Sequence, residues 1–206
     1  AIIAPEHDNL TGDNVYNSKG AIHYITDIEI DNAKNYLGNK VNNQKVVSLI
    51  LGGPNKYYSF DEDQLIKVFN EVKSNFISKG YKAIVIPSMR TPKAIINLAL
   101  KEFSECGHVV NSVDKQAYLS AYGLATHIVV TCDSTSMISE AATSGKPIFV
   151  AHMKTKRNNY RFKKFFKLFK EMGITRDLGE KIESWTYNKH NEAERIASII
   201  KRKIQN

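Results

Sequence analysis

The chain has 206 residues, 42% of them hydrophobic and 24% charged, and its formal net charge at pH 7 is +8. This composition indicates one folded domain, or one domain with an appendage, and excludes disordered and collagen-like chains. The longest apolar stretches have the length of strands, and the start Ala-Ile-Ile-Ala does not resemble a signal peptide, so we expect neither a transmembrane span nor a secreted protein. The only cysteines, Cys106 and Cys132, lack metal-ligand spacing and favour a reducing, cytoplasmic location.

Short apolar runs alternate with longer helical patterns along most of the chain. The predicted elements are, in chain order, a strand at 45–51, a helix at 61–79, a strand at 83–86, a helix from Thr91 as N-cap and Pro92 as first helical residue to about 103, a weak strand at 108–110, a helix at 117–125, a strand at 128–130, a helix ended by Gly145, a strand at 147–150, and helices at 160–172 and about 189–203. This alternation predicts an α/β fold, a Rossmann-like parallel sheet with helices on both faces.

The segment 127–150 is the most informative part of the sequence. Its polar turn carries Asp133, Ser134 and Ser136 between a strand and a helix, and Glu140 follows one helical turn later. The free N–H groups at such a helix start can bind an anion, and Glu140 could accept hydrogen bonds from a ligand's hydroxyls. In the alternative interpretation Ser134 or Ser136 only caps the helix, and Glu140 only favours its positive end.

Three polar turns follow strands of the predicted sheet, and right-handed crossovers place them at one edge. Glycines there let the backbone approach a phosphate, and an arginine can pair with it in a forked geometry. We therefore expect a nucleotide or phospho-sugar cleft formed by Gly52, Gly53, Asn55, Ser88, Arg90, Thr91, Asp133, Ser134, Ser136 and Glu140. The alternative is that Gly-Gly after a strand is simply a turn.

Other ligand classes are disfavoured. The sequence has no Gly-x-Gly-x-x-Gly and no Walker loop, which argues against a dinucleotide oxidoreductase and a P-loop NTPase. No His cluster indicates a metal, and we expect no cofactor, since a nucleotide-sugar would be the substrate. The positive charge favours acidic partners, but without a recognition helix, stacking strand or glycine-rich RNA loop we expect no nucleic-acid partner.

Several motifs of the chain resemble the mitochondrial-fission Elm-type family, which is found in bacteria and plants and whose bacterial members are often labelled nucleoside-diphosphate-sugar epimerases. The resemblance is carried by Pro5-Glu6-His7-Asp8, Asn14-Val15, Gly20-Ala21-Ile22-His23, Leu51-Gly52-Gly53-Pro54-Asn55, Ser88-Met89-Arg90-Thr91-Pro92, the block 131–141 and Thr143-Ser144-Gly145-Lys146-Pro147. It covers nearly the whole chain, and the Asp-Ser-x-Ser-Met-x-x-Glu-Ala block at 133–141 is its most specific part.

The resemblance implies a relationship to two-domain GT-B glycosyltransferases, whose C-terminal domain holds the nucleotide sugar. By position, Gly52 and Gly53 match the loop beside the diphosphate, Glu140 matches the ribose ligand, and Ser134 and Ser136 lie near the phosphates.

The length of the chain departs from that pattern. Residues 1–27 would be the remnant or tail of an N-terminal domain plus a linker, and residues 28–206 the Rossmann-like nucleotide-sugar-binding domain with a C-terminal helix. We therefore expect a donor-binding half, cut or truncated, that lacks most of its acceptor domain. If it is catalytic, the reaction would be metal-independent sugar transfer; the alternative is a non-catalytic interaction or membrane-associated module of the same family. An epimerase is disfavoured by the missing dinucleotide fingerprint.

His7 and Asp8 are the candidates for acid–base chemistry, because histidine titrates near neutral pH. Adjacent residues of a strand point to opposite faces, so both can line one site only if a turn intervenes. The alternative is a polar turn in which Asp8 or Asn9 acts as a cap.

Residues 160–172 predict a basic amphipathic helix. Its aromatic face would hold Phe162, Phe165, Phe166, Phe169 and Met172, and its basic face Lys163, Lys164, Lys167 and Lys170. Such a helix can lie on an anionic membrane, which would place the protein peripherally at the inner face of the membrane. We favour the alternative, in which the aromatic face packs on the sheet and the lysines are solvated. A homo-oligomer is a further option, since a second chain could supply a partner for the terminal helix.

Overall fold

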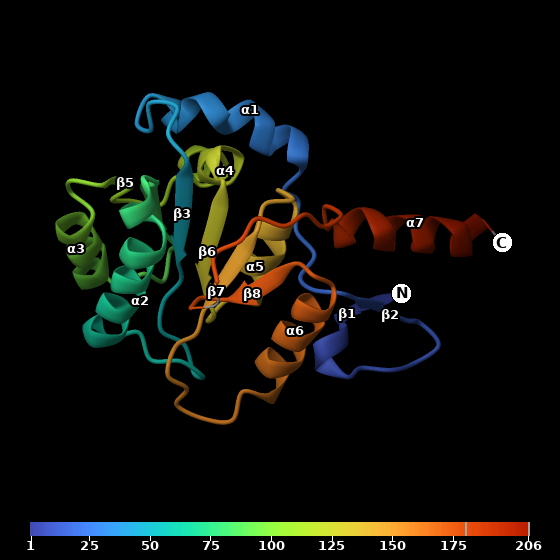
Figure 1. Cartoon of the computed structure of the whole chain (residues 1–206). Coiled ribbons are helices and arrows are strands. Elements are labelled where there is room, and N and C mark those ends of the chain that lie inside the picture. The colour runs from blue at the N-terminus through green and yellow to red at the C-terminus, as the bar shows by residue number, and fades with distance from the viewer. Residues whose placement is uncertain (180, 206) are drawn as a thin grey trace.

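Six parallel strands form the central sheet (Figure 1). The computed structural model describes residues 1–179 and 181–205. The strands are β3 (Val46–Leu51), β4 (Lys82–Pro87), β5 (Gly107–Val109), β6 (His127–Thr131), β7 (Ile148–Ala151) and β8 (Thr175–Asp177). Their order is β5-β4-β3-β6-β7-β8, which, counted from β3, is the order 3-2-1-4-5-6 of a doubly wound Rossmann sheet. The switch point of this sheet lies between β3 and β6, which are hydrogen-bonded neighbours.

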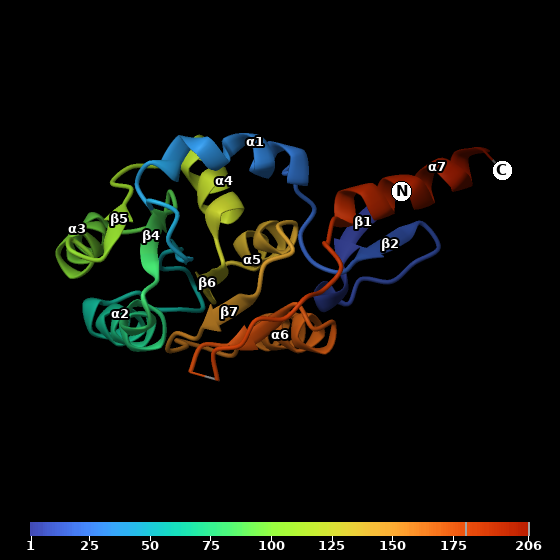
Figure 2. The same ribbon diagram turned by 45° about the horizontal axis from the view of Figure 1, so that its top comes forward.

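Helices cover both faces of the sheet, which confirms the predicted fold class. They are α1 (Asp27–Gly38), α2 (Glu62–Asn75), α3 (Lys93–Glu102), α4 (Lys115–Leu124), α5 (Thr135–Ala142) and α6 (Tyr160–Glu171). Figure 2 shows α1, α4 and α5 on one side of the sheet and α2 on the other, where α2 contacts α3. Because both faces are covered, the inner strands are continuous apolar runs, and every residue of β3 and β6 is buried.

The N-terminal residues lie apart from this sheet. β1 (Ile2–Pro5) and β2 (Val15–Ser18) pair in parallel as a separate two-stranded sheet, with the short 3-10 helix η1 (Glu6–Asp8) after β1. The terminal helix α7 (Glu192–Gln205) lies beside them (Figure 2), and its Glu192 accepts a hydrogen bond from the backbone N–H of Lys19 at 2.6 Å. A capping box at Thr26 starts α1. The predicted division of the chain near residue 27 stays a prediction.

Two differences from the predicted helix boundaries have a clear physical reason. The helix expected over 61–79 ends at Asn75, and a short 3-10 turn, η2 (Ile77–Lys79), continues to Gly80, whose φ of 82° ends it. Pro92, in extended conformation, is the N-cap of α3 in place of Thr91. The prediction for Thr91 was wrong because its hydroxyl bonds to the neighbouring strand end instead of to the helix.

Helix α6 has its aromatic side on the core, as favoured from the sequence. Phe165 and Phe169 are fully buried, and Phe162 and Phe166 pack partly buried against the core. The helix contacts the outer strand β8 and the N-terminal turn η1. This contact with η1 brings the N-terminal residues to the carboxyl edge of the sheet.

Candidate functional site

The polar turns after β3, β4 and β6 lie together at the carboxyl edge, as the crossover rule predicts. The backbone N–H of Gly52 donates to Thr131 Oγ1 at 2.8 Å, and that of Gly53 donates to Asp133 Oδ2 at 2.9 Å. The side-chain amide of Asn55 donates to the carbonyl oxygen of Asp133 at 2.9 Å. These bonds join the turn after β3 to the turn after β6 across the switch point.

Asp133 is the centre of this cluster. Its side chain is fully buried, and Arg90 donates from Nη2 to Asp133 Oδ2 at 2.8 Å and from Nη1 to the carbonyl oxygen of Gly53 at 2.7 Å. Thr131 Oγ1 donates to the second carboxylate oxygen at 2.7 Å. A buried carboxylate is tolerated when it is paired and hydrogen-bonded in this way. Arg90 and Asp133 therefore hold the three turns together.

Gly52 and Gly53 are required by this close approach of the turns. A Cβ atom on Gly53 would lie 2.0 Å from the backbone oxygen of Arg90, and one on Gly52 would lie 2.1 Å from a carboxylate oxygen of Asp133. No real Cβ contact is that short, so packing alone explains both glycines. Their predicted contact with a phosphate stays a prediction.

Ser88 and Thr91 stabilise the turn after β4. The hydroxyl of Thr91 approaches the carbonyl oxygens of Leu51 and Gly52 at 3.0 and 2.6 Å, and accepts from the backbone N–H of Ser88 at 2.8 Å. Ser88 Oγ lies 3.2 Å from Thr91 Oγ1. Because these groups bond to one another, the structure gives them a role in fixing the turn, and their predicted ligand contacts are untested.

The start of α5 lies beside this cluster. Ser134 is the N-cap, and its hydroxyl accepts from the backbone N–H of Met137 at 3.3 Å, while Ser136 is exposed. The first N–H groups of a helix have no acceptor within the helix and favour a bound anion. Thr135, the first helical residue, lines a cavity of about 190 Å³ together with His7, Tyr57, Arg161 and Phe162.

His7 and Asp8 lie in η1. A turn at this point is what both side chains need in order to line one site. His7 is only 6% exposed, its ring meets Phe165 edge-on at 5.5 Å, and its Nδ1 has no hydrogen-bond partner among the described residues. Burial lowers the pKa of His7, so the imidazole is neutral near pH 7. Asp8 is more exposed and forms an ion pair with Arg161. Asn9, in left-handed conformation, ends the turn.

Glu140 lies further along α5 in a half-buried polar cluster. Its Oε2 accepts from the hydroxyl of Tyr118 at 2.5 Å, and the hydroxyl of Tyr122 donates to that of Tyr118 at 2.6 Å. Burial raises the pKa of Glu140, while Tyr118 and His23 lower it. Burial also raises the pKa of both tyrosines, which keeps their hydroxyl protons in place as donors.

Sequence reasoning missed Tyr118 and Arg161 as members of the site, and gave His23, in the Gly20-Ala21-Ile22-His23 motif, no definite role. Tyr118 and Tyr122 stand four residues apart on α4, which places them on one face, but nothing in that spacing indicates contact with α5. His23 lies in the segment between β2 and α1, and its Nε2 is 3.2 Å from the carbonyl oxygen of Ser139. These residues reach the site through tertiary packing, for which the sequence offers no local signal.

Among residues 1–179 and 181–205 there is no group of three or more His, Cys, Asp or Glu side chains that could hold a metal ion. None of the described helices is both long and apolar enough to cross a bilayer.

The sheet order and the gathered polar turns define a Rossmann-type α/β domain. The chain belongs to the family described as mitochondrial fission ELM1, whose profile matches residues 1–204. It is 32% identical over 171 residues to the uncharacterized protein RP120 of Rickettsia prowazekii, and 26% identical over 167 residues to the mitochondrial fission protein ELM1 of Arabidopsis thaliana. These alignments cover 77% of this chain in both cases, but 46% and 38% of the relatives. The chain therefore spans less than half the length of the curated relatives it matches.

The chain is also similar to solved structures at low sequence identity. A Listeria monocytogenes protein assigned as a UDP-N-acetylglucosamine 2-epimerase matches 96% of this chain and 55% of its own, with a TM-score of 0.50 and 14% identity. The ADP-heptose LPS heptosyltransferase II of E. coli matches 63% of this chain and 38% of its own, with a TM-score of 0.44 and 12% identity. At these identities the likeness concerns the fold alone.

Proposed function

We propose that this chain binds a nucleoside-diphosphate sugar at the carboxyl edge of its sheet, as the donor-binding part of a GT-B-like glycosyltransferase-related protein. The observation that carries the proposal is the cavity at the start of α5, which joins Thr135 to Arg161 and His7. It lies beside the β3–β6 switch point, where doubly wound sheets bind their ligands. A helix start and a guanidinium are the groups that suit a diphosphate.

The position of Glu140 supports a ligand whose diphosphate lies at the start of α5 and whose ribose lies further along that helix. It lies on α5 beyond the proposed phosphate position, and Oε2 is its only side-chain oxygen with a hydrogen-bond partner among the described residues. The carboxylate can therefore accept further hydrogen bonds, and the hydroxyls of a ribose are suitable donors. Tyr118 fixes the carboxylate, so little side-chain freedom is lost when the ribose binds.

The proposed transfer needs no metal, because the departing diphosphate can be stabilised by the start of α5 and by Arg161. The sequence prediction assigned this cation to Arg90. In the structure Arg90 is engaged with Gly53 and Asp133, so Arg161, on the wall of the cavity, is the better candidate. Its ion pair with Asp8 is largely exposed and can be exchanged for a phosphate at little cost.

A second candidate function is a non-catalytic interaction module of the same family. The specific observation in its favour is that Arg90 and Asn55 already bond to Asp133 within the protein, and Thr91 to the carbonyl oxygen of Gly52. When the polar groups of a site are hydrogen-bonded without a ligand, the domain can stay folded after it has lost its catalytic activity.

The two candidates are separated by equilibrium titration of UDP, GDP and ADP against the chain, compared with Arg161→Gln and a control, Lys101→Gln. Lys101 is an exposed cation on α3. We expect one nucleotide to bind, with affinity reduced roughly tenfold, about 1.4 kcal/mol, in Arg161→Gln and unchanged in the control. Equal affinities in all three proteins would show that the cavity at α5 is not the phosphate site.

A further inference from the structure

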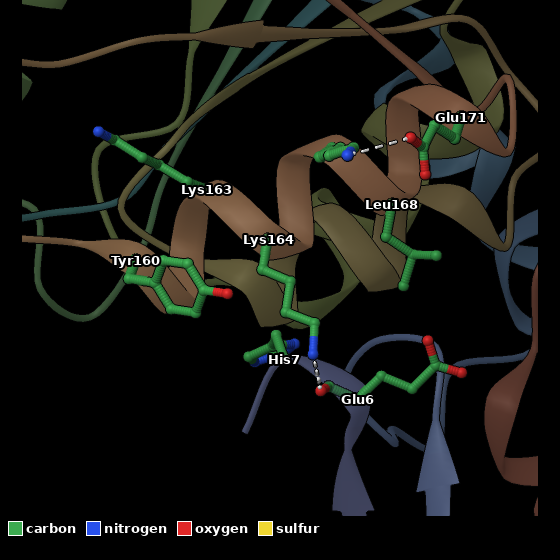
Figure 3. A pocket seen from close by; sticks show the side chains of 8 residues that line it. Glu6, His7, Tyr160, Lys163, Lys164, Leu168 and Glu171 are labelled. Carbon is green, nitrogen blue, oxygen red and sulfur yellow. Dashed lines mark hydrogen bonds and ion pairs between the residues drawn. The ribbon is translucent and has the colours of Figure 1, made fainter. Parts of the chain in front are cut away.

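His7 also lines a second and larger cavity, of about 470 Å³, between η1 and α6. Figure 3 shows Tyr160, Lys164 and Leu168 projecting from α6, with Glu6 and His7 opposite them. The volume is within the range of small-molecule sites in proteins. The cavity is distinct from the one at the start of α5, because the two share only His7.

Two of the three lysines that line this cavity, Lys163 and Lys164, lack an acidic partner among the described residues. Lys164 donates to the carbonyl oxygen of Glu6 at 2.9 Å and to the side-chain oxygen of Asn9, and both acceptors are neutral. Lys163 has no ion pair with any described residue and extends away from η1 on a flexible stem (Figure 3). Lys167 meets Glu171 at 3.8 Å in an exposed contact of little strength. Lys163 and Lys164 therefore form no ion pair with a described residue, although Glu6 and Glu171 also line the cavity.

A phosphate matches this arrangement. Its oxygens can accept hydrogen bonds from Lys164, and from Lys163 as well once that flexible side chain turns toward η1 (Figure 3). A phosphomonoester carries a charge of about −1.5 to −2 at neutral pH. Leu168 and the ring of Tyr160 offer apolar surface to the carbon skeleton of a ligand. Tyr160 is 61% exposed, so the cavity is open to an entering molecule.

We propose that the cavity between η1 and α6 binds a phosphate-bearing glycosyl acceptor. This proposal rests on the donor site proposed above. Donor and acceptor would meet at His7, the residue common to the two cavities. A hydroxyl oxygen of the acceptor forms the bond to the anomeric carbon, and the bond from that carbon to the diphosphate oxygen breaks. The nucleoside diphosphate leaves with the electron pair, and the hydroxyl proton passes to the imidazole of His7 and then to water.

The test uses glycerol 3-phosphate as probe and glycerol as its uncharged control, titrated against the whole chain. We expect saturable binding of glycerol 3-phosphate only, weakened at least fivefold in Lys163→Gln/Lys164→Gln. Leu168→Trp, which fills the cavity and keeps both lysines, should weaken it to the same degree. The matched control Lys93→Gln/Lys101→Gln removes two exposed cations from α3 and should leave the affinity unchanged.

A parallel experiment separates a free phosphate ester from a lipid headgroup. Vesicles of phosphatidylcholine with and without phosphatidic acid are sedimented with the same proteins. Binding to phosphatidic acid that the cavity variants lose and the α3 control retains supports a lipid-borne phosphate. Equal loss in cavity and control variants, or no saturable binding of either probe, overturns the proposal.

Titration of UDP against the same variants distinguishes a failure of the acceptor cavity from a failure of the donor site. UDP binding that persists while glycerol 3-phosphate and vesicles fail overturns only the acceptor cavity. If the protein binds glycerol 3-phosphate but no nucleotide, the cavity between η1 and α6 is a phosphate site. Its proposed role as an acceptor site would then be contradicted.

Discussion

The guanidinium of Arg90 donates to the carboxylate of Asp133 over 2.8 Å, although the two residues are 43 positions apart in the sequence. Arg90 follows β4 and Asp133 follows β6, and both strands neighbour β3. The glycine turn after β3 lies between them, and its Gly53 donates to Asp133 and accepts from Arg90. One ion pair thus fixes the relative positions of three turns at the edge where the proposed ligand binds.

Arg90→Ala should therefore lower the free energy of unfolding as well as alter the site. Asp133 is fully buried and would lose its cation, and hydrogen bonds to charged groups contribute about 1.5–3 kcal/mol each. Urea denaturation measures the change, and Lys93→Ala, an exposed cation on the following helix, should change it by less than about 0.5 kcal/mol. A loss no larger than that of the control would show that the pair is not structural.

Gly53→Ala should destabilise the protein by about 1–3 kcal/mol, because the added Cβ would collide with the rigid backbone oxygen of Arg90. Gly38, the last residue of α1, has no atom within 4 Å of its added Cβ. Gly38→Ala is therefore the matched control, and we expect it to stabilise by a few tenths of a kcal/mol through the unfolded chain. Thermal unfolding of both variants tests the difference, and equal melting temperatures would contradict it.

The stability should fall on acidification, in part through His7. Burial, with Arg161 and Lys164, lowers the pKa of His7 from 6.5, while Asp8 raises it. Between the folded and unfolded pKa values the unfolded chain binds more protons, so the free energy of unfolding rises with pH through that window. Acidification from about pH 7 to about pH 5 then destabilises the protein.

His7→Phe should make this pH dependence shallower, as measured by denaturation at each pH. Part of the slope should remain, because burial also lowers the pKa of His108 and of His127. An unchanged slope in His7→Phe would mean that His7 is not protonated more readily on unfolding.

The sequence was sufficient to predict the inner strands of the sheet, because they are buried on both faces and read as largely apolar runs. It did not reveal α1, whose exposed Ile28 and Tyr36 obscure the buried face formed by Ile30, Ala33 and Leu37. The short strands β1, β2 and β8 were also missed. Three or four residues give too little alternation to be distinguished from loops.

For the site, the crossover rule was enough to gather the three turns, but it does not say which polar groups bond to each other. Thr91 illustrates this limit. Threonine before proline is typical of a helix start, yet its hydroxyl bonds to Leu51 and Gly52 on the neighbouring strand end. Likewise, Arg161 enters the site only because η1 packs against α6, a contact between distant parts of the chain.

The central claim is that a nucleotide binds here with its ribose at Glu140, and calorimetric titration with UDP, GDP and ADP tests it most directly. Glu140→Ala removes the carboxylate, whereas Glu140→Gln keeps an oxygen that can accept from Tyr118 and so preserves the local packing. We predict saturable binding of at least one nucleotide, weakened roughly tenfold in both variants because each lacks the charged acceptor. A folded wild-type chain that binds none of the three nucleotides, or binding that neither variant weakens, would contradict the proposed donor site.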